Sequence, residues 1–333
     1  MERAGKNMKR KITVLTLCAT LFALCVPAQA QQAMKIPRIG YLAVSTPSAH
    51  SARVAAFRQG LRDLGYIEGQ NIVIEIRYAE GNSNRLPEAA AELVRLKVDA
   101  IVTTGTEGTV AAKQSTTTIP IIMTTGDPLA AGIIASLARP GGNITGLTNV
   151  ATDLTGKRLE LLKETVPSMT RTGFLWYPPD PGGVVNFKAI EPTARTLGLE
   201  IQSLEVRSPK EFDGVFKTAT ERHVHALAVQ SSGLFNAHRT RITELVTKVR
   251  LPSMFSEAAY VEAGGLMYYG PNTPDLYRRA ATYVDKILKG AKPGDLPVEQ
   301  PTKFEFIVNL KTAKQIGVTI PQWVLMRADK VVK

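Results

Sequence analysis

The chain has 333 residues, is 44% hydrophobic and carries a formal net charge of +12. About 300 residues remain once a leader is set aside, which is more than one hydrophobic core usually serves, so two domains are expected. The basic residues do not gather in a recognisable nucleic-acid module but punctuate amphipathic helices, as at Arg53, Arg58 and Arg62. This spacing is typical of a solvated basic surface and argues against a nucleic-acid partner.

The first 30 residues have the organisation of a secretory signal peptide. Lys9, Arg10 and Lys11 precede an apolar run over 12–26, and Ala28-Gln29-Ala30 supplies the small residues of a cleavage site. The run is too short to span a bilayer comfortably. We therefore expect cleavage of residues 1–30 and a mature protein in the periplasm.

Both cysteines, Cys18 and Cys25, lie in the segment to be removed. The mature chain then has neither a disulfide nor a thiol, which excludes cysteine ligation and cysteine nucleophiles. A lipidated cysteine normally follows a small residue, whereas Leu24 precedes Cys25. A soluble protein is expected rather than a lipoprotein.

Short apolar runs alternate with segments of helical period through the mature chain. This alternation predicts an α/β fold with parallel sheets. The first half contains strands over 38–44, 71–78, 100–104 and 120–124, and helices over 51–64, 85–96, 107–115 and 129–138. The last helix is expected to stop at Arg139-Pro140-Gly141-Gly142, because proline and glycine disfavour its continuation.

This unit occurs twice. Residues 38–42 recur as 171–175, 98–102 as 224–228, and 119–123 as 251–255, at offsets of 133, 126 and 132 residues. The segments that follow the first helix of each unit, 71–76 and 200–206, also correspond. An ordered series at nearly constant offset predicts two Rossmann-like lobes of the same architecture.

The expected division places 36–148 and 271–333 in lobe 1 and 149–270 in lobe 2. A helix over 275–288 should return the chain to lobe 1, and a strand over 304–309 could form a further crossing. Several crossings would make a hinge that bends without letting the lobes separate.

Several motifs resemble the ABC-transporter substrate-binding family that includes tryptophan-binding TrpX-like proteins. They are Ile119-Pro120-Ile121, Gly126-Asp127-Pro128, the run over 136–146, Ala263-Gly264-Gly265-Leu266, Tyr269-Gly270-Pro271-Asn272, the stretch from 288 to 298, and 309–313. The resemblance covers essentially the whole mature chain. It implies a type I periplasmic-binding fold, no cofactor and an ABC permease in the inner membrane as partner. Family members that bind known ligands take amino acids, notably aromatic ones.

Parallel sheets bind ligands outside the carboxyl ends of their strands, so two facing lobes should enclose the ligand between their strand tips. The candidate ligand-binding residues are Ser45, Thr46, Gly105, Thr106, Gly126 and Asp127 in lobe 1, and Tyr177, Ser231, Ser232, Ser256 and Glu257 in lobe 2. For the lobe 1 residues the alternative is that they are ordinary helix caps.

Each candidate has an expected role. Helix N-termini after Ser45, Thr106 and Asp127 suit a ligand carboxylate. Tyr177 suits an aromatic group, and Asp127 or Glu257 could hold an ammonium group. Together with the family resemblance, these roles imply a small carboxylate-bearing ligand, an amino acid or an analogue with an apolar or aromatic side chain. We also expect a monomer.

Two other functions stay open at this stage. One is a ligand-sensing module for a membrane receptor, and the other is a hydrolase-type enzyme, for which Ser45 with His50 is the only candidate pair. His223-Val224-His225 lacks the further ligands that a structural metal site needs. The segment 105–108 lacks the lysine and glycine spacing of a P-loop. We therefore expect no metal and no catalytic residues.

Overall fold

The structure is a computed structural model that describes residues 36–333. The expected signal peptide and both cysteines lie outside this range. Within it, no helix combines the length and the apolar character needed to cross a membrane.

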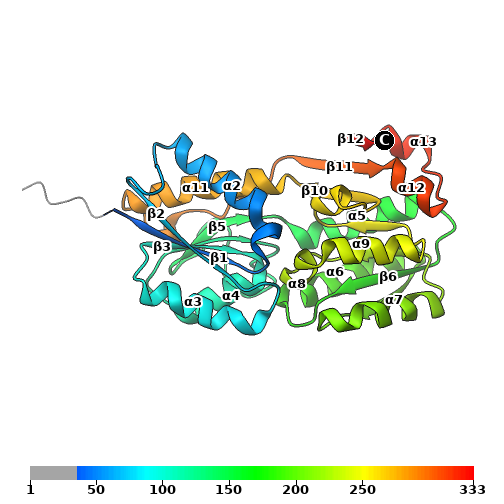
Figure 1. Ribbon diagram of the computed structural model, residues 1–333, viewed down its shortest axis with the longest axis horizontal. Helices are drawn as coiled ribbons and strands as arrows, with labels where there is room; N and C mark the ends of the chain where they lie inside the picture. The colour runs from blue at the N-terminus through cyan, green and yellow to red at the C-terminus, as the bar shows by residue number, and fades with distance from the viewer. Residues whose placement is uncertain (1–35) are drawn as a thin grey trace, which may run out of the picture. The chain divides into compact units, whose positions relative to one another are not determined.

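The first lobe is a five-stranded parallel sheet with helices on both faces (Figure 1). Its strands are β1 (Arg38–Ala43), β2 (Val73–Tyr78), β3 (Ala100–Thr104), β4 (Ile121–Thr125) and β5 (Ile144–Thr148), in the order β2-β1-β3-β4-β5. Helices α2 (Pro47–Asp63) and α11 (Thr273–Leu288) cover one face, and α3 (Leu86–Arg95) and α4 (Gly105–Ser115) cover the other. Strands β3 and β4 are buried along their whole length, as expected for a sheet covered on both faces.

The second lobe is a seven-stranded sheet in the order β12-β11-β10-β9-β8-β6-β7. Its strands are β6 (Arg171–Trp176), β7 (Glu200–Glu205), β8 (Ala226–Val229), β9 (Ser253–Phe255), β10 (Met267–Pro271), β11 (Phe304–Asn309) and β12 (Lys330–Val332). Helices α5 (Ala151–Thr165), α6 (Pro181–Thr196), α12 (Leu310–Ile316) and α13 (Gln322–Leu325) pack on one face. Helices α7 (Phe212–Glu221), α8 (Gly233–Ala237) and α9 (Arg239–Lys248) pack on the other, with α10 (Ala259–Glu262) nearby.

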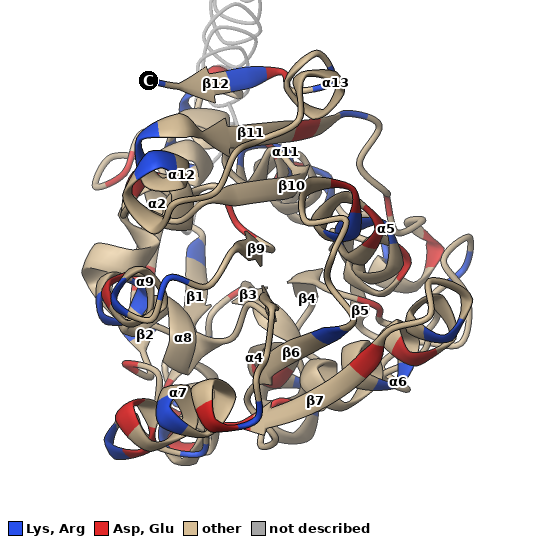
Figure 2. Cartoon of the chain, turned by 90° about the vertical axis from the view of Figure 1, so that its right-hand side faces the viewer, with Lys and Arg blue, Asp and Glu red and all other residues tan. Residues whose placement is uncertain are grey.

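The duplication is confirmed. Read from its β7 edge, the second sheet runs β7-β6-β8-β9-β10, which repeats β2-β1-β3-β4-β5 of the first. Each pair of matched segments forms the equivalent strand in its lobe, and these strands all run parallel. Figure 2 shows basic and acidic residues intermingled on helices of the second lobe, including α7.

The expected division of the chain is corrected at its C-terminal end. Helix α11 does return to lobe 1, and residues 296–299 pair beside β5, where Thr148 donates to the carbonyl of Glu299 at 2.9 Å. Strand β11, however, pairs antiparallel with β10, and β12 pairs with β11. Residues 304–332 therefore belong to lobe 2. In lobe 1 the edge strand β5 is already paired with 296–299, whereas in lobe 2 the edge strand β10 still offers free backbone hydrogen-bonding groups. Within residues 36–333 the chain crosses between the lobes three times.

The expected helix over 129–138 is absent. Asp127 Oδ1 accepts hydrogen bonds from the backbone N–H groups of Leu129 and Ala130, and Gly132 adopts a left-handed conformation with φ of 66°. Lys113 Nζ donates to the carbonyls of Gly132 and Ile133. These side-chain bonds replace helical ones, so the segment forms turns over the end of α4.

Helix α11 is held on lobe 1 by a close approach to α2. A Cβ atom on Gly60 would lie 2.2 Å from the carbonyl oxygen of Arg278 and 2.9 Å from the Cβ of Ala281. Glycine thus lets the two helix backbones meet. Figure 1 shows α2 and α11 side by side above the first sheet.

Gly60→Ala is expected to lower the free energy of unfolding by about 1–3 kcal/mol, because the added methyl group meets backbone atoms that cannot rotate away. Gly214→Ala is the matched control, since Gly214 lies in α7 and a Cβ there meets nothing within 4 Å. The control should leave stability unchanged or raise it by up to about 1 kcal/mol. Urea denaturation measures both, and equal stability of the two variants would contradict the packing argument.

Candidate functional site

The strand tips of the two lobes enclose a cavity of about 100 Å³. Such a volume holds several water molecules, which suits a small ligand. The cavity is bordered by the starts of α4, α5 and α6, at Thr106, Ala151 and Gly182. Helix N-termini favour negative groups, so the walls are built for charged ligand atoms.

Eight of the eleven candidate residues line this cavity. They are Gly105, Thr106, Gly126, Asp127, Ser231, Ser232, Ser256 and Glu257. Each follows the carboxyl end of a strand, as the rule for parallel sheets requires. The remaining three, Ser45, Thr46 and Tyr177, are not among the lining residues.

Ser45 and Thr46 serve the local structure of lobe 1. Thr46 is the N-cap of α2, where its side chain accepts a hydrogen bond from Ala49 N–H at 3.3 Å. The backbone N–H of Ser45 donates to Nε2 of His50 at 3.2 Å, while the buried Ser45 hydroxyl has no partner among the described residues. The Nε2 atom of His50 therefore already accepts a hydrogen bond from a backbone N–H group and is not directed at the Ser45 hydroxyl. This arrangement does not support the nucleophile–base pair.

Tyr177 joins the two lobes through its hydroxyl group. Its side chain is only 5% exposed, and its hydroxyl lies 3.0 Å from the hydroxyl of Ser83 in lobe 1. Ser83 in turn donates to the carboxylate of Glu107. The structure thus places Tyr177 in an interlobe hydrogen-bond network instead of facing the cavity.

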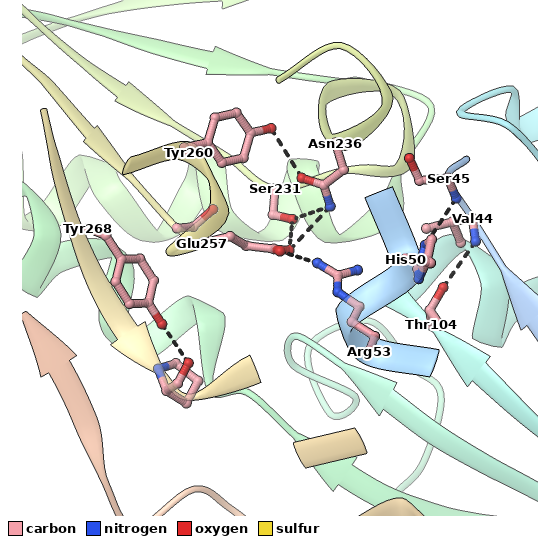
Figure 3. A network of polar contacts seen from close by, with 12 residues as sticks. Val44, Ser45, His50, Arg53, Thr104, Ser231, Asn236, Glu257, Tyr260 and Tyr268 are labelled. Carbon is pink, nitrogen blue, oxygen red and sulfur yellow. Dashed lines mark hydrogen bonds and ion pairs between the residues drawn. The ribbon is translucent and has the colours of Figure 1, made fainter. Parts of the chain in front are cut away.

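The two acids expected to hold an ammonium group are already engaged. Oδ1 of Asp127 caps its own turn, as described above. Glu257 pairs with Arg53 across the lobes and also accepts from Ser231 and Asn236, whose Nδ2 lies 3.2 Å away (Figure 3). Burial raises the pKa of Glu257, but the charge of Arg53 and the hydrogen bonds that the carboxylate accepts together outweigh burial, so the net shift is downward.

Arg53 is not the solvated surface residue that its helical spacing predicted. It is only 8% exposed, whereas the guanidinium of Arg58 reaches the surface. Burial lowers the pKa of Arg53, but the charge and hydrogen bond of Glu257, together with the neighbouring tyrosine hydroxyl groups, outweigh burial, so the net shift is upward. Its guanidinium also stacks over the ring of Tyr277, with 5.7 Å between Cζ and the ring centroid. Arg53 is therefore an interlobe cation, not a solvated surface charge.

Arg158 is a buried cation that pairs with no carboxylate in the described part of the chain. It lies on α5, is 8% exposed and lines the cavity. Its Nε donates to the carbonyl of Tyr269 at 2.7 Å. Burial lowers its pKa to about 10, so it stays charged at neutral pH. A guanidinium in this position can bind an anion with its remaining N–H groups.

Glu107 and Asp180 are two buried acids that can bind a cation, whereas Arg158 can bind an anion. Both line the cavity and are 6% and 5% exposed, and their charges interact. Burial raises the pKa of each carboxyl, and the charge of Glu107 raises that of Asp180 further. Within residues 36–333 neither acid has a basic partner, so a ligand cation would be stabilised here.

Apolar side chains complete the walls. Phe174, Val185, Val229, Met254 and Leu276 border the same cavity. The ring of Phe174 packs against that of Phe187, with centroids 5.9 Å apart. Besides the Arg53–Glu257 pair and Asp127, the cavity thus combines the cation Arg158, the two acids Glu107 and Asp180 and an apolar wall. These are amphipathic surroundings for a small molecule.

Sequence reasoning missed Arg158, Glu107 and Asp180 for different reasons. Asp180 precedes Pro181 just after the strand tip at Tyr177, a helix-start signal that could have been used. Glu107 stands next to the predicted Thr106. Arg158 lies in the middle of a helix, where an arginine normally points to water, and only packing decides that it is buried.

The two-lobed fold with a charged cavity between the lobes defines a ligand-binding protein of the periplasmic-binding type. The family model described as ABC transporter substrate binding protein matches residues 41–332. The chain belongs to this family.

Individual relatives agree with this assignment. A tyrosine-binding protein of Clostridioides difficile (strain R20291) is 27% identical over 274 residues, which are 82% of this chain and 78% of the relative. The crystal structure of an ABC domain in complex with L-Trp from Streptococcus pneumoniae is 25% identical, with a TM-score of 0.82, covering 89% of this chain and 99% of that one.

A third structure bears on the arrangement of the lobes. The ligand-free, open structure of a substrate binding protein with adhesive properties from Clostridium difficile is 26% identical and covers 90% of this chain and 99% of that one. Its TM-score is only 0.63, although its identity is slightly higher than that of the L-Trp complex. The structure described here therefore resembles the ligand-bound arrangement more than the open one.

Tyr177→Phe is expected to weaken ligand binding by about two- to tenfold, because one interlobe hydrogen bond of about 0.5–1.5 kcal/mol is lost. The loss should be the same for aromatic and aliphatic ligands, since the ring does not border the cavity. Calorimetry with one ligand of each kind measures this. A loss confined to aromatic ligands would restore the stacking role for Tyr177.

Proposed function

We propose that this protein is the exported solute-binding component of an ABC importer and holds an amino acid with an apolar or aromatic side chain between its lobes. The observation that carries the proposal is that, among residues 36–333, one cavity holds Arg158 with no carboxylate partner and Glu107 and Asp180 with no cation partner. A zwitterion supplies both missing charges at once.

The polar half of the ligand follows from these charges. Arg158 takes the carboxylate by charge-assisted hydrogen bonds, helped by the N-terminus of its own helix α5, which borders the cavity. Glu107 and Asp180 take the ammonium group, which offsets the desolvation of two neighbouring carboxylates. The hydroxyl groups of Thr106, Ser231 and Ser232 and the carboxylate of Asp127 complete the polar wall. The ammonium group is thus proposed to bind Glu107 and Asp180, and not Asp127 or Glu257 as the sequence alone predicted.

The side chain of the ligand lies against Phe174, Met254 and Val185. These residues cannot satisfy a polar side chain, so apolar and aromatic amino acids are favoured over charged ones. The relatives named above for tyrosine binding and for a complex with L-Trp support the same class of ligand.

The remaining parts of the proposal concern the cell. Export removes residues 1–30, and the mature monomer works in the periplasm with an ABC permease of the inner membrane. The protein binds and releases its ligand unchanged. The lobes close about the hinge segments at 148–151, 271–273 and 299–304, where the chain crosses between the two sheets.

A thermal-shift screen over amino acids, simple carboxylates and simple amines tests the ligand class. At a concentration of about 100 times Kd a true ligand stabilises the folded protein by about 2.7 kcal/mol, which raises the melting temperature. We expect a shift with apolar or aromatic amino acids and none with carboxylates or amines alone. A response to sugars but to no amino acid would contradict the proposal.

Arg158→Gln tests the carboxylate contact. Loss of a charge-assisted hydrogen bond of about 1.5–3 kcal/mol should weaken amino-acid binding about ten- to hundredfold. The empty protein should keep or gain stability, because an unpaired buried charge is removed. Arg62→Gln, an exposed position, is the control. Unchanged affinity of the Arg158 variant in calorimetry would show that the carboxylate binds elsewhere.

A further inference from the structure

The two unpaired acids of the cavity belong to different lobes. Glu107 lies in the first turn of α4 in lobe 1, and Asp180 is the N-cap of α6 in lobe 2. Their neighbours touch across the cleft, since a Cβ atom on Gly182 would lie 2.8 Å from Oγ1 of Thr106. The two acids therefore come together only when the lobes close.

The hydrogen bonds of both acids come from neutral groups. Glu107 accepts from the backbone N–H of Gly233 at 3.1 Å and from the hydroxyl of Ser83. Asp180 accepts from the backbone N–H of Gly182 and from Nε2 of Gln230, each at 3.0 Å. The Gly233 bond also crosses between the lobes, so closure fixes Glu107 in place.

The charged groups on the surrounding elements are engaged elsewhere. Arg53 pairs with Glu257, and Arg158 bonds to a backbone carbonyl. Lys113 of α4 donates to carbonyls of the turn that follows β4, and Lys188 of α6 is exposed at the surface. Asp127 adds a further negative charge to the cavity wall, and the Tyr177 hydroxyl is linked to Glu107 through Ser83. No cation among residues 36–333 therefore pairs with either acid.

Closure changes the surroundings of these carboxylates. In separated lobes each is hydrated, whereas in the closed form they are buried near each other, where like charges repel strongly. The helix N-termini of α4 and α6 favour the charged forms, but burial outweighs them and raises both pKa values. Closing over an empty cavity is therefore unfavourable while both acids are charged.

We propose that Glu107 and Asp180 gate the closure of the lobes, so that the empty protein stays open at neutral pH until a cationic group of the ligand, or a proton, lies between them. The identity of that cationic group as an ammonium rests on the proposed function, whereas the gate itself rests on the position of the two acids. A consequence is that empty closed protein, which would compete for the importer, is kept scarce.

The direction of the pH dependence follows from linkage. Because closure raises the carboxyl pKa, the closed empty form binds more protons than the open form. Lowering the pH then shifts the empty protein toward the closed form, by up to about tenfold per pH unit for each proton taken up. Ammonium and proton compete for the same acids, so ligand affinity should fall over the same pH range.

The experiment uses the mature protein, freed of ligand by denaturation and refolding. Small-angle scattering gives the radius of gyration of the empty protein at about pH 7.5 and about pH 5. Both pH values lie above the ordinary pKa values of Asp and Glu, so exposed carboxyl groups stay charged at both. The empty parent should become more compact at the lower pH. Glu107→Gln should be compact at both, because the amide keeps the shape of the side chain but removes its charge.

Two further variants guard the interpretation. Asp180→Asn removes the other charge and keeps a good helix cap, so it should behave like Glu107→Gln even if that variant folds poorly. Glu88→Gln makes the same change of net charge at an exposed position of α3, and should follow the parent at both pH values. An empty parent whose size is independent of pH, or acid variants as open as the parent, would overturn the gate.

This outcome is separate from that of the ligand screen, because no ligand is present. If amino acids bind but the empty protein does not change with pH, the gate is wrong and the proposed function stands. If the empty protein closes at low pH but no amino acid binds, the gate stands and the ligand carries another cationic group.

Discussion

The burial of charge between the lobes is the constraint on which the site depends. A charge removed from water must find a partner, and the lobes bury Arg53, Glu257, Arg158, Glu107 and Asp180 around one cavity. Only Arg53 and Glu257 satisfy each other across the cleft. Among residues 36–333 the other three have no partner of opposite charge, and the proposed zwitterionic ligand is inferred from these charges.

The duplicated architecture explains why the charges can meet. Each lobe presents the carboxyl ends of parallel strands, and the starts of the following helices, to the same space. The attractive Arg53–Glu257 ion pair and the repulsion between Glu107 and Asp180 both act between opposite lobes. Under the proposed gate, the balance between open and closed forms would depend on what occupies the cavity.

The return of the chain to lobe 2 after α11 adds a third connection between the lobes. Helix α11 is fixed on α2 through the close approach at Gly60, and 296–299 pair beside β5 before the chain returns to β11. Three segments of the described chain thus cross the hinge. They let the lobes bend relative to each other but keep them from separating. Among the relatives, one is named for tyrosine binding and one was solved in complex with L-Trp.

The sequence by itself determined the α/β class, the duplication and most strand positions, because these follow from local periodicity and from order along the chain. The strand over 304–309 was placed correctly, but its lobe was not, since pairing with β10 is a long-range choice. Eight candidate residues reached the cavity because strand tips are local features. The burial of Arg53 and Arg158, the inward facing of Glu107 and Asp180, and the turn at 127–139 were decided only by tertiary structure. A side chain on a helix can face water or a neighbouring lobe with the same local sequence, and only the packing of distant elements selects between them.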